Sequence, residues 1–254
     1  MIAHPRYRNL AITEESFQMI NWNAINTVLL DMDGTLLDLH FDNYFWQEYV
    51  PQKYAERHSI TVMQSKNELE PRFAQQEGRL QWYCLDFWEK ELNLDIVALK
   101  NEINHLISFR PNAREFLHSL KERGKQVIMI TNAHPNSLSI KLERLSMAHY
   151  FDRLISSHDY GYPKESQAFW QNLEVDISLD KEKALFIDDS VRILNSARTY
   201  GIRHLLAVRY PDSKKGAWDT QGYEAVEDFR ELITPATISP EKIAPEKIAS
   251  EKTV

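Results

Sequence analysis

The sequence predicts an α/β fold in which helices cover both faces of a parallel sheet. Short runs of consecutive apolar residues recur along the chain, and amphipathic helical patterns separate them. Unbroken apolar runs, as opposed to alternating ones, are typical of parallel strands that are buried on both faces. Several runs also end directly in acidic or hydroxyl-bearing residues. Ligands of parallel α/β sheets bind outside the carboxyl ends of the strands, so these ends are where we expect the site.

Five strands are predicted, at residues 27–30, 126–130, 153–156, 184–187 and 203–208. Gly124 and Gly201 precede the second and fifth strands, as expected where a helix ends. Three helices are predicted between the strands, at residues 112–123, 137–145 and 191–200. In the first of them, Phe116, Leu117 and Leu120 share one face, which we expect to pack on the sheet.

Residues 41–107 interrupt this alternation. The segment lacks a convincing strand, is rich in aromatic residues and carries helical patterns at 43–57, 62–77, 81–92 and 96–106. A structureless loop of this length is uncommon inside a compact domain, so we interpret the segment as an inserted helical cap. The α/β core then consists of residues 1–40 and 108–234.

The last twenty residues, 235–254, differ from the rest of the chain. A charged five-residue unit beginning with Pro240 repeats from Pro245, and a shortened copy begins at Ser250. Proline at this period prevents a regular helix, so we expect a disordered tail.

Composition sets outer limits on the function. The formal net charge of -7 argues against nucleic-acid binding, which favours a basic surface. Cys84 is the single cysteine, so no internal disulfide can form. We find neither a signal-peptide pattern nor a run of about 18 apolar residues that could span a membrane. We therefore expect a cytoplasmic protein without membrane or nucleic-acid partners.

Polar residues follow three of the predicted strands. They are Asp31, Asp33 and Thr35 after the first strand, Thr131 and Asn132 after the second, and Asp188 and Asp189 after the fourth. Up to four carboxylates at one edge would repel one another unless a cation joins them. Oxygen ligands without any evident cysteine or histidine cluster indicate Mg²⁺ and not zinc. For each aspartate taken alone, a simple turn is the alternative interpretation.

These residues carry a family resemblance. Asp31-Met-Asp33-Gly-Thr, Thr131, Lys164 and Asp188-Asp189, in this order, resemble the motifs of the haloacid dehalogenase-like superfamily. Further stretches resemble the purine 5'-nucleotidases of that superfamily, which act on GMP and IMP; they lie at residues 38–46, 81–88, 131–135, 161–165 and 185–190. The likeness extends over about residues 22–233. It implies a Rossmann-like core with a type-one cap after the first strand, and a Mg²⁺-dependent phosphatase.

The resemblance also implies roles for individual residues. Asp31 would be the nucleophile and a metal ligand, and Asp33 the general acid and base, with its main-chain carbonyl on the metal. Thr131, Asn132 and Lys164 would bind the phosphoryl group. Two further residues complete the metal site in this scheme. Asp188 would be a direct metal ligand, while Asp189 would act through water or orient Lys164.

The substrate is predicted less sharply than the chemistry. A cap of this type closes over the site, and its aromatic side chains could stack on a purine. We expect most of these rings to form the cap's own core. The candidates for facing the site are Asp42, Asn43, Trp46, Trp82 and Tyr83.

Three functions remain open from the sequence. The first is a phosphatase of GMP or IMP, and the second is a sugar-phosphate phosphatase or phosphomutase. The third is a non-catalytic binding protein, although the joint presence of Asp31, Asp33, Lys164 and Asp188 argues against it. Asp33 also argues against a dehalogenase, which needs no acid for a halide leaving group. Oligomeric state stays open.

Overall fold

A computed structural model describes residues 20–233 of the chain. Residues 1–19 and 234–254 are not described, so the predicted repeat tail at 235–254 lies outside the described residues.

A six-stranded parallel sheet forms the base of the molecule, in the order β3-β2-β1-β4-β5-β6. The strands are β1 (Thr27–Leu30), β2 (Gln126–Thr131), β3 (Arg153–Ser156), β4 (Ala184–Asp188), β5 (His204–Val208) and β6 (Ala225–Val226). The predicted α/β class and parallel sheet are thus confirmed. Strand β6 was not predicted, because two residues are too few to give a recognisable apolar run.

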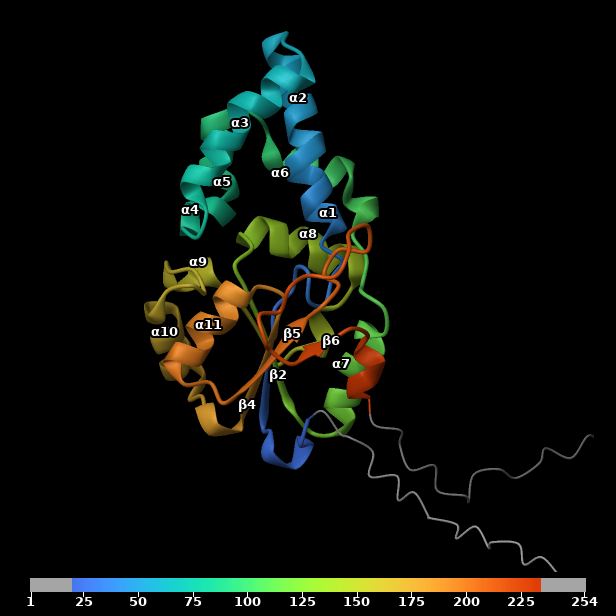
Figure 1. The fold of residues 1–254 in the computed structure, drawn as a ribbon, viewed down its shortest axis with the longest axis vertical. Coiled ribbons are helices and arrows are strands. Elements are labelled where there is room, and N and C mark those ends of the chain that lie inside the picture. The colour runs from blue at the N-terminus through green and yellow to red at the C-terminus, as the bar shows by residue number, and fades with distance from the viewer. Residues whose placement is uncertain (1–19, 234–254) are drawn as a thin grey trace, which may run out of the picture.

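Helices cover both faces of this sheet (Figure 1). They are α7 (Ala113–Glu122), α8 (Pro135–Leu145), α9 (Ser157–Tyr160), α10 (Gln167–Ile177) and α11 (Val191–Tyr200). Alternate residues of β1 point to opposite faces of the sheet. Val28 packs in the apolar cluster that contains Phe116 of α7, and Leu29 packs in the cluster that contains Trp170 of α10. The sheet therefore separates two apolar layers, which explains the unbroken apolar strands. The predicted set of helices lacked α9 and α10.

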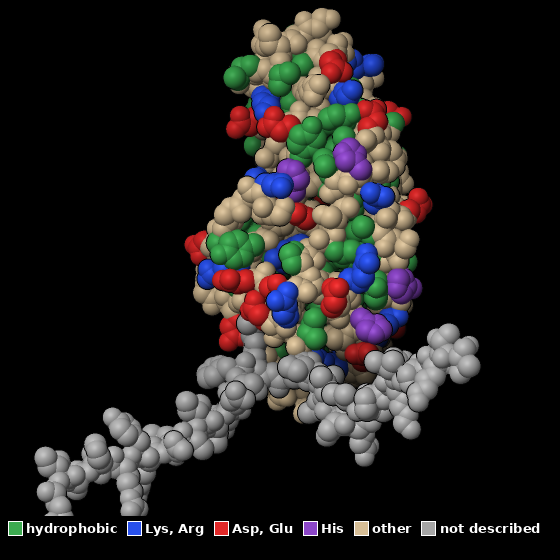
Figure 2. Space-filling view, turned by 90° about the vertical axis from the view of Figure 1, so that its right-hand side faces the viewer, with side chains coloured by type: hydrophobic (Ala, Val, Ile, Leu, Met, Phe, Trp, Pro, Cys, Tyr) green, Lys and Arg blue, Asp and Glu red, His purple; other side chains and the backbone are tan. Residues whose placement is uncertain are grey.

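The other α-helices, together with the π-helical turn η2, lie between β1 and α7 in the chain and extend beyond the carboxyl ends of the strands (Figure 1). They are α1 (His40–Tyr44), η2 (Phe45–Tyr49), α2 (Val50–His58), α3 (Val62–Gln76), α4 (Leu80–Tyr83), α5 (Leu85–Leu92) and α6 (Ile96–Glu102). This part forms the narrower end of the molecule in Figure 2, and acidic and basic side chains are interspersed on the face shown there.

Two of the helices expected in this segment differ from their predicted form. The first begins at His40, earlier than expected, and contains the π-helical turn η2, a feature that apolar periodicity does not reveal. The helix expected at 81–92 is broken at Cys84, whose backbone is extended. Trp82 and Trp88 stabilise the break, because the Trp88 indole donates to the Trp82 carbonyl oxygen at 2.9 Å.

Aromatic side chains fill the interior of this helical segment. Phe45 and Trp88 are buried, and Phe73 lies edge-on to Trp88 with ring centroids 5.0 Å apart. Trp46 and Trp82 are half-buried at the side facing the sheet. Within residues 20–233, no helix has the length and apolar character needed to cross a bilayer.

Candidate active site

The carboxyl ends of β1, β2 and β4 open into a cavity of about 380 Å³, a size suited to a small ligand. Its lining includes every site residue that the sequence predicted: Asp31, Asp33, Thr131, Asn132, Lys164, Asp188 and Asp189. The five candidates from the helical segment also line it: Asp42, Asn43, Trp46, Trp82 and Tyr83. One space therefore brings together predicted site residues that are up to 158 positions apart in the chain, from Asp31 to Asp189.

Lys164 occupies the centre of the site. Its Nζ donates to Asp31 Oδ1 at 2.5 Å and to Asp188 Oδ2 at 2.7 Å, and its side chain is buried. A third bond, to the Ile130 carbonyl oxygen at 3.2 Å, completes the donor capacity of the ammonium group. Burial disfavours the charged form of Lys164, but the negative charges of Asp188 and Asp31 have the larger combined effect and raise the pKa of Lys164. The lysine is therefore a fixed positive charge between two carboxylates.

The loop after α9 places this lysine. Gly161 ends α9 with a left-handed backbone, φ 74°, and the chain then passes through Pro163. The Lys164 backbone N–H donates to Asn132 Oδ1 at 2.9 Å, while Asn132 Nδ2 donates to Glu165 Oε2 at 3.0 Å. Asn132 thus ties the loop to the end of β2, which explains why Asn132 and Lys164 meet in the cavity.

Three carboxylates form a second feature. Oxygen atoms of Asp31, Asp188 and Asp189 all lie within 4.8 Å of one another. Burial raises the pKa of Asp31 to about 6. The pKa of Asp189 is raised well above its ordinary value, mainly by burial and to a smaller extent by the charges of Asp188 and Asp31. Such crowding favours a bound cation, and the all-oxygen donor set suits a hard ion. The cluster could therefore hold a metal ion, in agreement with the predicted acidic site.

The geometry differs from the expected division of roles between Asp188 and Asp189. Asp188 makes the contact to Lys164 at 2.7 Å, which had been one of the alternatives for Asp189. Asp189 instead lies against Gly34, where a Cβ atom would come within 2.3 Å of Asp189 Oδ2. Gly34 has φ +83°, so both backbone conformation and space require glycine here.

Asp33 lies in a separate network of buried charges. Lys141 Nζ donates to Asp33 Oδ1 at 2.6 Å and to Asp42 Oδ2 at 2.7 Å, and Lys100 Nζ donates to Asp42 Oδ1 at 2.8 Å. Burial is the largest influence on Asp33 and raises its pKa to about 7, although Lys141 acts in the opposite direction. Lys100 and Lys141 overcome burial at Asp42 and hold its pKa far below the ordinary value.

Sequence reasoning missed both lysines of this network. The signal was present in α8, where Ser137, Leu138 and Lys141 share the buried face, so a lysine stands at a core position of an amphipathic helix. Asp42 was expected to face the substrate. It does line the cavity, but both of its oxygens accept from lysines.

Thr131 ends β2 with its side chain buried. Its Oγ1 accepts from the Ala133 backbone N–H at 3.0 Å, which shapes the turn before α8. The hydroxyl proton remains available for a ligand in the cavity, which Thr131 lines.

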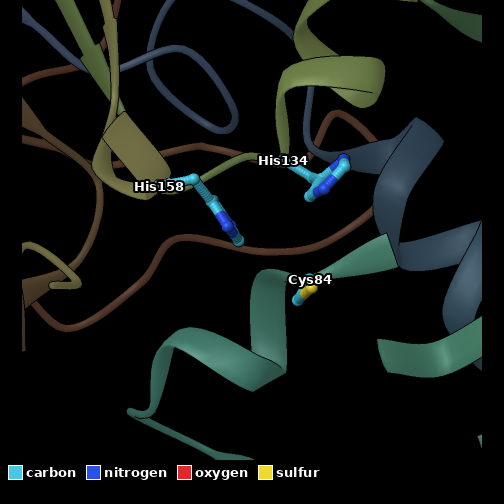
Figure 3. Close-up of side chains that lie close together, drawn as sticks. All are labelled: Cys84, His134 and His158. Carbon is cyan, nitrogen blue, oxygen red and sulfur yellow. The ribbon is translucent and has the colours of Figure 1, made fainter. Parts of the chain in front are cut away.

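A cysteine–histidine cluster lies at the edge of the cavity, between the helical segment and the sheet. Cys84, His134 and His158 each offer a ligand atom, and these atoms all lie within 4.8 Å of one another (Figure 3). The expectation that the chain contains no such cluster is wrong. The three residues are dispersed in the sequence, so their spacing carried no signal.

The fold and the site define a hydrolase: the chain belongs to the haloacid dehalogenase-like hydrolase family, which it matches over residues 25–201. The resemblance stated from the motifs is thereby confirmed. Among curated proteins, the GMP/IMP nucleotidase YrfG of Escherichia coli strain K12 is 42% identical over 214 residues, covering 84% of this chain and 96% of that protein. The (S)-2-haloacid dehalogenase 2 of Pseudomonas sp. strain CBS-3 is 24% identical over 196 residues, covering 70% and 82%.

Solved structures support the same fold. A HAD phosphatase from Thermococcus onnurineus superposes with a TM-score of 0.68 at 19% identity, covering 82% of this chain and 96% of that chain. An L-2-haloacid dehalogenase from Xanthobacter autotrophicus gives a TM-score of 0.56 at 14% identity over the same share of both chains. The fold thus occurs with phosphatase and dehalogenase chemistry, and the site residues must decide between them.

Proposed function

We propose that this protein is a Mg²⁺-dependent phosphatase that hydrolyses purine nucleoside 5'-monophosphates, GMP and IMP above all, through an aspartyl-phosphate on Asp31. The observation that carries the proposal is the position of Lys164 between Asp31 and Asp188, in the cavity that Asp33 also lines. The 42% identity to a GMP/IMP nucleotidase supports the choice of substrate.

The proposed reaction has two steps. An Asp31 oxygen attacks phosphorus, the bond from phosphorus to the nucleoside 5'-oxygen breaks, and Asp33 donates a proton to that oxygen. Asp33 then takes a proton from water, the water oxygen attacks the aspartyl-phosphate, and inorganic phosphate leaves as the Asp31 carboxylate reforms. Throughout, Lys164 neutralises negative charge beside Asp31, exchanging one of its present hydrogen bonds for a phosphoryl oxygen, and the Thr131 hydroxyl donates to another phosphoryl oxygen.

A metal ion fits this site because the carboxylates of buried Asp31 and Asp188 and half-buried Asp189 crowd together within 4.8 Å. Asp31, Asp188 and the Asp33 main-chain carbonyl would hold Mg²⁺, with Asp189 beside them. When bound, Mg²⁺ would neutralise negative charge on the phosphoryl group and the carboxylates. Repulsion among the carboxylates, otherwise relieved only by Lys164 and by protonation, would then be relieved by the ion.

The environment of Asp33 suits a group that both donates and accepts a proton. A general acid and base works best when its pKa is near the working pH, and burial raises the pKa of Asp33 to about 7. A halide leaving group requires no proton, so this residue favours phosphatase over dehalogenase chemistry despite the 24% identical dehalogenase relative.

We further propose that residues 41–107 act as a cap over a core of residues 1–40 and 108–234. Trp82 is the best candidate for stacking on the purine, because it is half-buried and lines the cavity, and because Phe73, at 6.3 Å, is its one ring neighbour among residues 20–233. Trp46, in contrast, packs against Phe45, Phe73 and Trp88 and serves the interior of the cap. A nucleotide substrate also fits a protein of the cytoplasm.

The charge network argues against a phosphomutase. A mutase needs a free cation on the cap for the second phosphate of its substrate. Lys100 is the cap lysine that lines the cavity among the described residues, and Asp42 neutralises it at 2.8 Å.

A panel of phosphomonoesters with and without Mg²⁺ tests the proposal. Release of phosphate from GMP and IMP well above release from hexose phosphates, and only with Mg²⁺, is the expected result. Equal or better turnover of hexose phosphates would favour a sugar-phosphate phosphatase. Absence of turnover with every ester would leave only a binding function.

A further inference from the structure

Three potential metal ligands from three separate elements surround one small space (Figure 3). Cys84 stands at the junction of α4 and α5, His134 precedes α8 after β2, and His158 lies in α9 after β3. The two imidazole rings are 5.0 Å apart at 79°. None of the three side chains has a role in the proposed phosphatase reaction.

The imidazole of His158 is neutral and, among the described residues, has a free nitrogen that could bind a metal ion. Its Nε2 is buried and has no hydrogen-bond partner within residues 20–233, which is costly for a polar atom. The imidazole makes a hydrogen bond to the Asn132 backbone that favours its protonated form, so the ring is the donor and a carbonyl oxygen accepts. Because Nε2 has no partner in this part of the chain, the donating nitrogen is Nδ1. A donor bond at Nδ1 fixes the tautomer whose Nε2 lone pair is free, an arrangement typical of metal-bound histidine. Burial, together with the nearby His134, lowers the pKa of His158 to about 4, so its imidazole is neutral.

His134 has a neighbour at each ring nitrogen. Its Nδ1 accepts from the Asn136 backbone N–H at a long 3.3 Å, and its Nε2 lies 3.7 Å from Asp86 Oδ2. Asp86 is in the first turn of α5, two residues after Cys84. A metal bound at Nδ1 would replace the long bond from Asn136, and Asp86 would then orient the ring through Nε2–H.

We propose that Cys84, His134 and His158 bind a divalent cation of the Zn²⁺ class. Tetrahedral zinc with bonds of about 2.0–2.3 Å places its ligand atoms roughly 3.5 Å apart. The three ligand atoms lie within 4.8 Å of one another, so binding requires shifts of at most about 1 Å. A thiolate and two imidazoles favour Zn²⁺ over Mg²⁺, whereas the carboxylate cluster of Asp31, Asp188 and Asp189 favours Mg²⁺. The two sites therefore select different metals.

Binding would have a mechanical consequence, which rests on the proposed function. Cys84 belongs to the proposed cap, while His134 and His158 follow strands of the core. The adjacent Tyr83 already contacts the core by donating to Glu165 Oε1 at 2.8 Å. An ion shared by all three ligands would fasten this edge of the cap, and because caps must open for exchange of substrate and product, turnover would slow.

Cobalt titration tests the binding independently of activity. Full-length, metal-stripped protein is titrated with Co²⁺ in excess Mg²⁺, which occupies the carboxylate cluster. We expect the thiolate-to-cobalt charge-transfer absorption, lost on addition of Zn²⁺. Cys84→Ser should abolish this band, and His158→Ala should weaken Co²⁺ binding at least tenfold. His118→Ala, at an exposed histidine of α7, is the matched control and should bind like the wild type.

Two outcomes would overturn the site. One is a wild-type protein without the charge-transfer band, and the other is undiminished Co²⁺ affinity in His158→Ala with circular dichroism unchanged. The slowing of turnover is tested by measuring phosphate release with and without Zn²⁺ at saturating Mg²⁺. For each protein, the rate with Zn²⁺ is divided by the rate of the same protein without Zn²⁺. We expect Cys84→Ser to need at least tenfold more Zn²⁺ for half-inhibition. Equal inhibition of the variant and the wild type would overturn the fastening role even if Co²⁺ binding is as expected.

Discussion

Lys141 Nζ lies 2.6 Å from Asp33 Oδ1 and 2.7 Å from Asp42 Oδ2, so a single buried cation on α8 joins the residue proposed as general acid to helix α1. Asp33 follows β1 at the edge of the sheet, whereas Asp42 belongs to the helical segment above it. The ionisation of Asp33 and the position of α1 are thereby coupled through one side chain.

Replacing Lys141 by methionine tests this coupling. Lys141 lowers the pKa of Asp33, so its removal raises that pKa further. The protonated acid then persists to higher pH, and the falling alkaline limb of kcat/KM for GMP should move upward by about one pH unit or more. Lys100→Met is the control: Lys100 contacts Asp42 but not Asp33, and its removal should move the limb less. An unmoved limb in Lys141→Met would show that Asp33 does not control this step.

Sequence reasoning could locate the residues at strand ends, but not the groups that meet them from elsewhere. Asp31, Thr131 and Asp188 follow unbroken apolar strands, so their neighbourhood was fixed by the parallel sheet alone. Lys141 gave only the signal of a charge on a buried helix face. Its partner Asp42 is 99 residues away, and no local pattern encodes such a pairing.

The same reason explains the missed features of the helical segment proposed as a cap. Cys84 breaks a continuous helical pattern because tertiary contacts, including the Trp88 to Trp82 bond, stabilise an extended residue there. The meeting of Cys84 with His134 and His158 depends on how α4–α5 sits against the sheet. Periodicity predicts which face of a helix is buried, but not which distant residues it contacts.

Asp31→Asn should abolish turnover while the fold persists. An amide is a poor nucleophile and cannot form the aspartyl-phosphate, so kcat for GMP should fall at least about a thousandfold. The isosteric side chain keeps its place beside Lys164, which also retains Asp188. Phosphate release and circular dichroism are the measurements. A variant with kcat near that of the wild type would exclude Asp31 as nucleophile.

Lys164→Met should destabilise the protein strongly when Mg²⁺ is absent. The substitution leaves Asp31 and Asp188 buried without their cation, and loss of one partner of a buried ion pair costs about 3–5 kcal/mol. Urea unfolding with and without Mg²⁺ measures this, and added Mg²⁺ should stabilise the variant more than the wild type. Lys181→Met, which removes a more exposed pair with Glu174, should cost roughly 0–1 kcal/mol. Equal losses in both variants would contradict the proposed charge balance.

Gly34→Ala should weaken metal binding through Asp189. The added Cβ would lie 2.3 Å from Asp189 Oδ2, so the carboxylate must move away from Asp31 and Asp188. Gly124→Ala controls for backbone strain, since Gly124 also has positive φ but no atom within 4 Å of the added Cβ. We expect a higher Mg²⁺ concentration for half-maximal activity in Gly34→Ala only. The same Mg²⁺ requirement in both variants would argue that Asp189 does not contribute to the metal site.

Trp82→Leu should affect substrates that carry a base and spare those without one. Stacking of a base on an aromatic ring contributes about 1–3 kcal/mol, so the KM for GMP should rise roughly 5- to 150-fold. Ribose 5-phosphate offers the same phosphoryl group without the purine, and its kcat/KM should change little. Phe87→Leu is the matched control, because Phe87 packs on Trp88 in the same helical segment but does not line the cavity. If Trp82→Leu instead impairs both substrates equally, Trp82 supports the shape of the cap and another residue recognises the base.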